Sequence, residues 1–162
     1  MNEKIQNLKS VISKIKQRDA SVATEVLKHI NAFENKSNES YEYVESGMIK
    51  YQRNDLVGAS QDFDNAIKLY PNADAYYNRG VIQMDRENLI NGITDFTAAI
   101  LLYPEHGNAY HNRGLCVLAI LSFEGAMKSS ECSDILEFAR NDLKKSISLG
   151  NNNSAEYLRA SY

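Results

Sequence analysis

Two near-copies of one six-residue phrase stand 34 residues apart in this chain. The phrase AYYNRG at 75–80 returns as AYHNRG at 109–114. A period of this length is typical of helical hairpins that stack side by side. The repeat therefore predicts a helical solenoid.

A second set of positions, made of small residues, phenylalanine and proline, repeats every 33 residues. Small residues allow two helix backbones to approach, phenylalanine fills the space between hairpins, and proline ends the second helix of each pair. The spacing thus describes helix packing. The positions are Gly47, Ala59, Phe63, Ala66 and Pro71, followed by Gly80, Gly92, Phe96, Ala99 and Pro104.

The order of aromatic, glycine, alanine, phenylalanine and proline over residues 40–106 resembles the tetratricopeptide repeat (TPR) family. This resemblance implies an all-α, right-handed superhelical solenoid of antiparallel helix pairs, with about three repeats in a single domain. The predicted repeats are 40–72, 73–106 and 107–153. The last segment, 154–162, is expected to be a capping helix, or the start of a further repeat if the chain is a fragment.

Residues 1–39 lack the markers of the repeat but place apolar residues at helical spacing, so we expect a helical hairpin there. Its helices are predicted over 2–18 and 21–34, and a polar loop over 35–40. The hairpin either covers the apolar side of the first repeat, as terminal units of solenoids must, or docks onto a partner or a second copy.

The third repeat is longer than the others. Gly114 to Ala139 spans 25 residues, whereas the matching interval in the first two repeats is 12. If Ala139 and Leu143 take the packing positions of their counterparts, 13 extra residues fall near 121–134. This insertion either lengthens the helices or forms a loop, and it is either a tolerated surface insertion or a projecting contact element.

Composition fits one folded domain, since 43% of the residues are apolar and 24% are charged. No apolar run reaches the roughly 18 residues that cross a bilayer, and the N-terminus lacks a signal-peptide pattern, so we expect a cytoplasmic protein with no membrane partner. Residues 40–162 carry eleven Lys and Arg against sixteen Asp and Glu. This balance disfavours nucleic acid and suits basic or neutral peptides better.

No catalytic or metal-binding motif surrounds His29, His106 and His111. Cys116 and Cys132 form no CxxC pair and are expected to be small core residues. We therefore predict no enzyme activity, no metal and no cofactor. His106 follows a proline turn and should be solvated, whereas His111 stands at a position where its titration would make peptide binding depend on pH near about 6.5.

In TPR stacks the first helix of each pair lines a concave groove, and the resemblance carries these positions over to this chain. Asn78 and Asn112 occupy equivalent places, and an asparagine amide offers a donor and an acceptor to the backbone of an extended peptide. Alternatively, these asparagines cap helix ends or bond the neighbouring hairpin. The predicted groove residues are Tyr41, Val44, Met48, Asp74, Tyr77, Asn78, Val81, Asn108, His111, Asn112 and Leu115.

The sequence thus predicts a protein-protein interaction module that binds an extended peptide or partner segment in its concave groove. The alternative is a small TPR chaperone or assembly subunit that works through its helical ends or its insertion, as a monomer or a homo-oligomer. Substitutions in the groove should abolish partner binding in the first case and spare it in the second.

One known groove, the carboxylate clamp of TPR co-chaperones for cytosolic heat-shock proteins, is mostly missing. Val44 and Met48 replace its first Lys and Asn. Asn78 keeps the middle Asn, but Asn108 and Asn112 replace the last Lys and Arg. Because each lost cation removes a charge-assisted hydrogen bond worth about 1.5–3 kcal/mol, we do not expect binding of an acidic chaperone tail.

Arginines directly precede two of the repeated glycines, and aspartates precede the bulky residue of each second helix. We predict that Asp62 pairs with Arg79 and that Asp95 pairs with Arg113. Such pairs between repeats would fix the stacking register.

Overall fold

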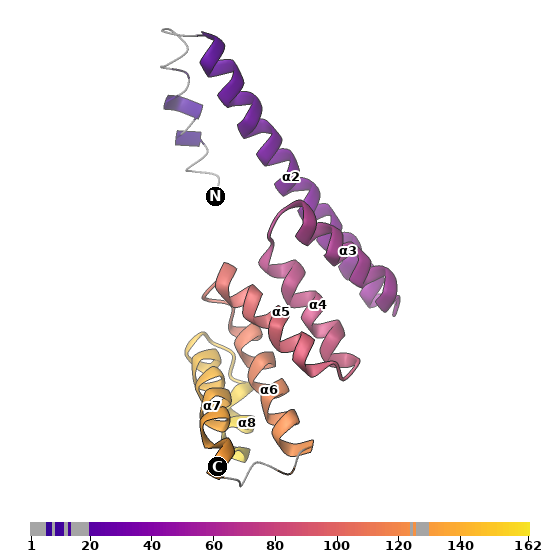
Figure 1. Cartoon of the computed structure of the whole chain (residues 1–162), viewed down its shortest axis with the longest axis vertical. Coiled ribbons are helices and arrows are strands. Elements are labelled where there is room, and N and C mark those ends of the chain that lie inside the picture. Colours follow the sequence, from indigo (N-terminus) through magenta and orange to yellow (C-terminus); the bar gives the residue numbers. More distant parts are fainter. Residues whose placement is uncertain (1–5, 8, 12, 14–19, 124, 126–129) are drawn as a thin grey trace.

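The computed structural model describes residues 6–7, 9–11, 13, 20–123, 125 and 130–162. Over these residues the fold is all-α, as predicted, and contains no strand. Consecutive helices pack in antiparallel pairs that follow one another along the long axis of the molecule (Figure 1). The helices are α2 (Ala20–Gln52), α3 (Leu56–Leu69), α4 (Ala73–Asp85), α5 (Leu89–Leu102), α6 (Gly107–Phe123), the 3₁₀ helix η1 (Ser130–Cys132), α7 (Ser133–Ser148) and α8 (Ser154–Ala160).

Side-chain caps determine where helices α3 and α4 begin. The Asp55 carboxylate accepts a hydrogen bond from the Gly58 amide at 2.8 Å at the start of α3. Asn72, which follows Pro71, accepts from the amides of Asp74 and Ala75 at the start of α4. These bonds satisfy amides that have no partner within the helix, which stabilises each helix start by about 0.5–2 kcal/mol.

Glycine lets the two helices of a hairpin approach, as the repeat predicts, and the phenylalanine of the second helix packs onto that glycine. A Cβ atom on Gly47 would lie 2.6 Å from the Phe63 ring, and one on Gly80 would lie 2.8 Å from the Phe96 ring. Both rings are almost fully buried. In both hairpins the phenylalanine of the second helix therefore packs where the first helix has a glycine and no side chain.

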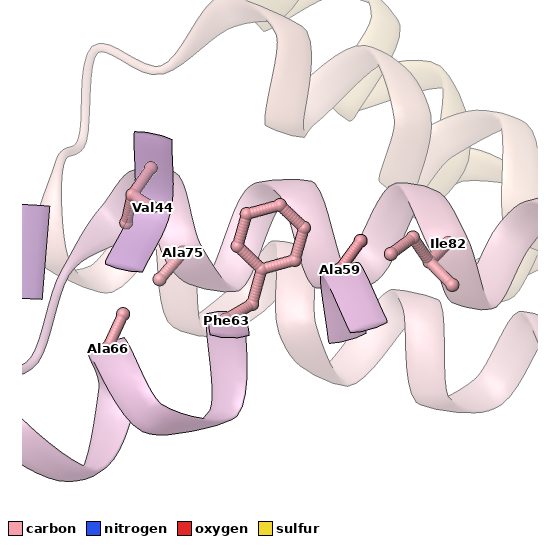
Figure 2. Packing of buried hydrophobic residues seen from close by; sticks show 6 residues of the cluster. All are labelled: Val44, Ala59, Phe63, Ala66, Ala75 and Ile82. Carbon is pink, nitrogen blue, oxygen red and sulfur yellow. The ribbon is translucent and has the colours of Figure 1, made fainter. Parts of the chain in front are cut away.

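The core runs between the hairpins as well as within them. Figure 2 shows the first cluster, in which Phe63 lies between small side chains of α2, α3 and α4. In the third hairpin, Leu143 is fully buried and its side chain lies 3.3 Å from the Cβ position of Gly114. Leu143 thus takes the place of the phenylalanine, as the spacing predicts, and Cys116 is confirmed as a core residue with 1% exposure.

The polar loop predicted over 35–40 is wrong, because α2 passes through these residues without a break. Two of them face the repeats: Ser37 and Ser40 are buried, and the Ser40 hydroxyl donates to the Ala66 carbonyl at 3.1 Å. Short polar side chains are tolerated in a helix when they bond outside it. The N-terminal part of α2 projects away from the stack (Figure 1), and the helix predicted over 2–18 lies mostly outside the described residues.

The insertion predicted near 121–134 lengthens the helices in part. Helix α6 has 17 residues, against 13 in its counterpart α4. On the other side of the insertion, η1 begins at Ser130 and α7 begins at Ser133. Residues 124 and 126–129 lie outside the described residues, so the choice between a surface insertion and a contact element stays a prediction.

The predicted ion pairs are wrong by one repeat. Arg79 pairs with Asp95, with Nη2 and Oδ1 2.6 Å apart, and Arg113 pairs with Asp142, with Nε and Oδ2 2.7 Å apart. Each pair joins the two helices of its own hairpin, α4 to α5 for Arg79 and α6 to α7 for Arg113. The reason is the glycine beside each arginine: the Cβ position of Gly80 lies 3.1 Å from Asp95 Cβ, so this face of α4 meets α5 of its own hairpin.

The same arginines also reach the preceding hairpin. Arg79 Nη1 lies 2.6 Å from Asp64 Oδ1 on α3, and Arg113 Nη1 donates to the Thr97 hydroxyl on α5 at 3.0 Å. In the first hairpin, Asp62 accepts instead from Lys50 and Ser46. The aspartate that precedes the bulky residue is thus bonded in all three hairpins, with a different donor in the first.

Candidate functional site

The eleven predicted groove residues lie on the first helices of the three hairpins, but the structure gives them different surroundings. Val44 is 4% exposed and belongs to the core in Figure 2, so it cannot contact a ligand, and the prediction for it is wrong. Tyr41 is exposed on α2. Most of the others border one of three hollows, which are described in turn.

The first hollow, here called the Met48 pocket, lies between α2 and α4 and has a volume of about 240 Å³. It brings together three of the predicted residues, Met48, Asn78 and Val81. Its wall is mostly apolar, and the Asn78 amide is a polar group within it. The lining residues are Met48, Tyr51, Gln52, Phe63, Asn78 and Val81.

Tyr51 fixes one wall of the Met48 pocket. Its hydroxyl donates to Asp85 Oδ2 at 2.7 Å, which ties the end of α2 to the end of α4. The bond to this carboxylate, together with burial, raises the pKa of Tyr51 to about 12. The phenol therefore stays protonated and keeps its ring in place. Sequence reasoning missed Tyr51, although it lies one helical turn beyond Met48.

Beside Asn78, Tyr77 is packed in a small aromatic group. Its ring lies 5.8 Å from Phe96 and 4.6 Å from His106, measured between centroids. Asn112 Nδ2 donates to the Tyr77 hydroxyl at 3.4 Å, and burial raises the pKa of that phenol. For Asn112 the structure thus shows the bond to the neighbouring hairpin that was one of its two predicted roles.

His106, expected to be solvated, is only partly exposed because it stacks on Tyr77. Burial lowers the pKa of its imidazole, and the nearby Asp74 carboxylate opposes this shift. At neutral pH the ring is therefore uncharged. No local pattern in the sequence indicates this contact, since it joins α4 to the loop before α6.

His111 faces α8. Its Nδ1 lies 2.8 Å from the Ser154 hydroxyl, and its ring meets the Tyr157 ring edge-on with centroids 5.5 Å apart. Burial lowers the pKa of His111. The main contacts of His111 are therefore with α8. A ligand that contacts His111 would also have to lie against α8.

A second hollow, here called the Asn108 hollow, has a volume of about 720 Å³ and lies where the loops between successive hairpins meet. It contains two predicted residues, Asp74 and Asn108. Asn108 Oδ1 accepts from Asn151 Nδ2 at 2.9 Å across it. The lining residues are Asp74, Tyr103, Glu105, His106, Gly107, Asn108, Leu149, Gly150, Asn151, Asn152 and Asn153.

The third hollow is an apolar groove of about 470 Å³ between α6 and α8, and it includes the predicted residue Leu115. Its lining is otherwise small or aliphatic except for Tyr157. The lining residues are Leu115, Leu118, Ala119, Ser122, Tyr157, Ala160 and Ser161.

Among the residues that the structure describes, no group of three or more His, Cys, Asp or Glu side chains is placed to hold a metal ion. Within that same part of the chain, no helix is both long and apolar enough to cross a membrane. Burial raises the pKa of the Cys116 thiol to about 11, so it stays protonated in the core.

No protein-family model matches the sequence, and no curated protein matches it either. Solved structures resemble its fold. The first TPR domain of Spaghetti (RPAP3), bound to the HSP90 peptide SRMEEVD, matches with a TM-score of 0.65 at 20% identity, over 77% of this chain and 91% of that chain. The Arabidopsis OM64 TPR domain matches with a TM-score of 0.65 at 20% identity, over 78% of this chain and 96% of that chain.

The TPR2B domain of yeast Sti1, in its complex with an Hsp70 peptide, matches with a TM-score of 0.59 at 23% identity. The match covers 78% of this chain and 94% of that chain. At these identities the likeness concerns the fold, and it extends over nearly the whole of each domain.

Proposed function

Because this chain has the tetratricopeptide repeat fold, we propose that it is a protein-interaction module that binds an extended peptide or partner segment across the first helices of its hairpins. The observation that carries this proposal is the Met48 pocket, a mostly apolar hollow with the side-chain amides of Asn78 and Gln52 in its wall. At about 240 Å³ it is smaller than a site for a drug-sized ligand. Its size suits a single apolar side chain.

In the proposed complex, an apolar side chain of the partner enters the pocket beside Met48 and Val81. Asn78 bonds the peptide backbone next to that side chain, because its amide both donates and accepts. Burial of one such side chain contributes about 1.5–3 kcal/mol, and each hydrogen bond adds about 0.5–1.5 kcal/mol. A further contact elsewhere on the surface is needed for micromolar affinity, which corresponds to about 8 kcal/mol.

We propose a different ligand from those of the similar domains. The first TPR domain of Spaghetti binds a peptide that ends in Glu-Glu-Val-Asp. In this chain, Arg79 and Arg113 are already paired with aspartates. Asp74 and Glu105 would repel an acidic tail. These features support a basic or neutral partner.

The proposal is tested by capturing partners from a lysate of the native cell with the intact protein and with an Asn78→Ala, Met48→Glu variant. Partners that bind through the pocket should not bind this variant, because it removes the Asn78 amide and places a charge in the apolar part of the wall. Asn141→Ala, on the exposed face of α7, is the matched control.

Circular dichroism first establishes that both variants keep their helices. Equal recovery of every partner by the pocket variant would contradict the proposal and favour binding through the ends of the solenoid or its insertion. A cytoplasmic location and the absence of enzyme activity stay predictions.

A further inference from the structure

The Asn108 hollow is the largest of the described cavities and has a distinct chemistry. Two carboxylates, Asp74 and Glu105, border it, together with the amides of four asparagines. No lysine or arginine is among its lining residues. Both carboxylates are exposed, so a ligand can reach them without any change in the fold.

This hollow adjoins the proposed peptide path through two consecutive residues of α4. Asn78 lines the Met48 pocket, while the ring of Tyr77 stacks on His106, which lines the Asn108 hollow. Asp74, which also borders the hollow, lies one helical turn before Asn78 on α4. Because residues four apart share one face of a helix, we expect an extended segment along that face to reach both hollows.

We propose that the Asn108 hollow receives a lysine or arginine side chain of the bound segment. This inference rests on the proposed function and names the chemistry of its partner: an apolar residue followed or preceded, a few residues away, by a basic one. The side chains of Asp74 and Glu105 bind the cation, and the asparagine amide oxygens accept its remaining N–H groups.

The fixed orientation of the amides supports a polar head group rather than an apolar one. The side chains of Asn108 and Asn151 are hydrogen-bonded to each other, and Asn151 Oδ1 also accepts from the backbone N–H of Asn153 at 3.2 Å. These bonds hold the side-chain amides of Asn108 and Asn151 before a ligand arrives, which reduces the entropy lost on binding. An anionic ligand would meet two carboxylates and no cation.

The first test uses a probe that does not depend on the partner. N-acetyl-arginine methylamide is titrated into the ¹⁵N-labelled full chain and followed by NMR. N-acetyl-glutamate methylamide, which carries the opposite charge, is the control probe. The arginine probe should shift the amide resonances of Asn108 and Asn151–Asn153, and the glutamate probe should not. Equal responses to both probes would overturn the inference.

The residues are tested with an Asp74→Asn, Glu105→Gln variant, which removes both charges at constant size. The affinity of this variant for the arginine probe should be at least tenfold lower, which corresponds to a loss of about 1.4 kcal/mol of binding free energy. Glu42→Gln, an exposed carboxylate on α2, is the control and should leave the binding unchanged. Unchanged binding by the double variant would also overturn the inference.

A second experiment separates this inference from the proposed function. Random twelve-residue peptides displayed on phage are selected on the intact protein and on the same double variant. Enrichment of an apolar residue with a basic one at fixed spacing, lost on the variant, would support both proposals. Selected peptides that need the Met48 pocket but show no basic position would overturn only this inference, and a failure to select any peptide would overturn both.

Discussion

Individual glycines decide how closely the two helices of a hairpin approach. Gly80→Ala should destabilise the protein by about 1–3 kcal/mol, because the added Cβ would meet the Phe96 ring at 2.8 Å and that ring is fully buried. Gly92→Ala should be neutral or stabilising by up to about 1 kcal/mol, since its Cβ would meet nothing closer than 3.4 Å and alanine favours the helix. Urea unfolding of the two variants measures the difference.

Equal stabilities for these two variants would contradict the account of the glycines. Gly92 provides a matched control, because it also lies in a helix and is also buried. The comparison therefore isolates the contact with phenylalanine from the general effect of replacing glycine.

Two partly buried histidines make stability depend on pH. Burial lowers the pKa of both His106 and His111 below the ordinary value of 6.5. As the pH falls through about 6.5, the unfolded chain takes up protons that the folded chain does not, so the free energy of unfolding should decrease. Urea midpoints at about pH 7.5 and pH 5.5 should show this loss.

A His106→Gln, His111→Gln variant should lose less stability over the same range than the original protein. Asn141→Ala, at an exposed position on α7, carries no titratable group and is the control that should keep the pH dependence of the original protein. If the double variant keeps the full dependence, the effect belongs to other groups.

At the scale of helices, ion pairs hold each hairpin closed. Arg113 and Asp142 share two hydrogen bonds and their side chains are 11% and 7% exposed. A double-mutant cycle with Arg113→Gln and Asp142→Asn should give a coupling energy of about 1–3 kcal/mol. Removing one partner alone should cost about 3–5 kcal/mol, because a charge is left buried.

The pair expected from the sequence, Arg113 and Asp95, provides the control for this cycle. Asp95 is bonded to Arg79, so its coupling to Arg113 should be small. A larger coupling for Arg113 and Asp95 than for Arg113 and Asp142 would show that the observed pairing is not the one that stabilises the protein.

The long helix α2 shows where local patterns are insufficient. Residues 35–40 are all polar, which resembles a loop, but they contain neither glycine nor proline. Ser37 and Ser40 are buried, and the bond from the Ser40 hydroxyl to the Ala66 carbonyl on α3 favours the helical state of this segment. An isolated reading of the segment cannot show this, because the acceptor of Ser40 lies 26 residues away.

For the whole molecule, the extent of the cooperative unit can be tested by truncation. A chain that begins at residue 33 should keep its melting temperature within a few degrees, since the part of α2 that is removed projects from the stack. A chain that begins at residue 41 loses the Phe33–Tyr70 ring contact and the Ser40 bond. Its melting temperature should fall by roughly 5–10 °C, the effect of about 2–3 kcal/mol in a domain of this size.

Sedimentation of the same two truncated chains and the intact one over a range of concentrations tests the alternative of self-association. Val26, on the part of α2 that the first truncation removes, and Phe33, which packs against Tyr70, are both about two-fifths exposed. If only the intact chain forms dimers, the N-terminal segment carries the contact. Equal masses at every concentration would exclude self-association through this segment.

The candidate site was predictable in part. Met48, Asn78 and Val81 do border one pocket. Helical spacing places Asn78 and Val81 on the same face of α4, and the repeat pairs this face with the matching position Met48 on α2. Tyr51 and Gln52 lie three and four residues after Met48 but were missed, because the groove positions taken from the family end one residue after the glycine. Phe63 was missed because it comes from another helix, α3. The Asn108 hollow could not be predicted, because its wall is made of two separate loops and the first turns of two helices.

The sequence by itself determined the helical hairpins and the positions where they touch, because glycine, alanine and phenylalanine recur at intervals that only stacked helix pairs explain. The tertiary structure alone decided which aspartate each arginine meets, how far α2 continues and which side chains share a hollow. Periodicity defines the face on which a residue lies. The partner on the opposite face depends on how two helices cross, and that is set by the side chains of both.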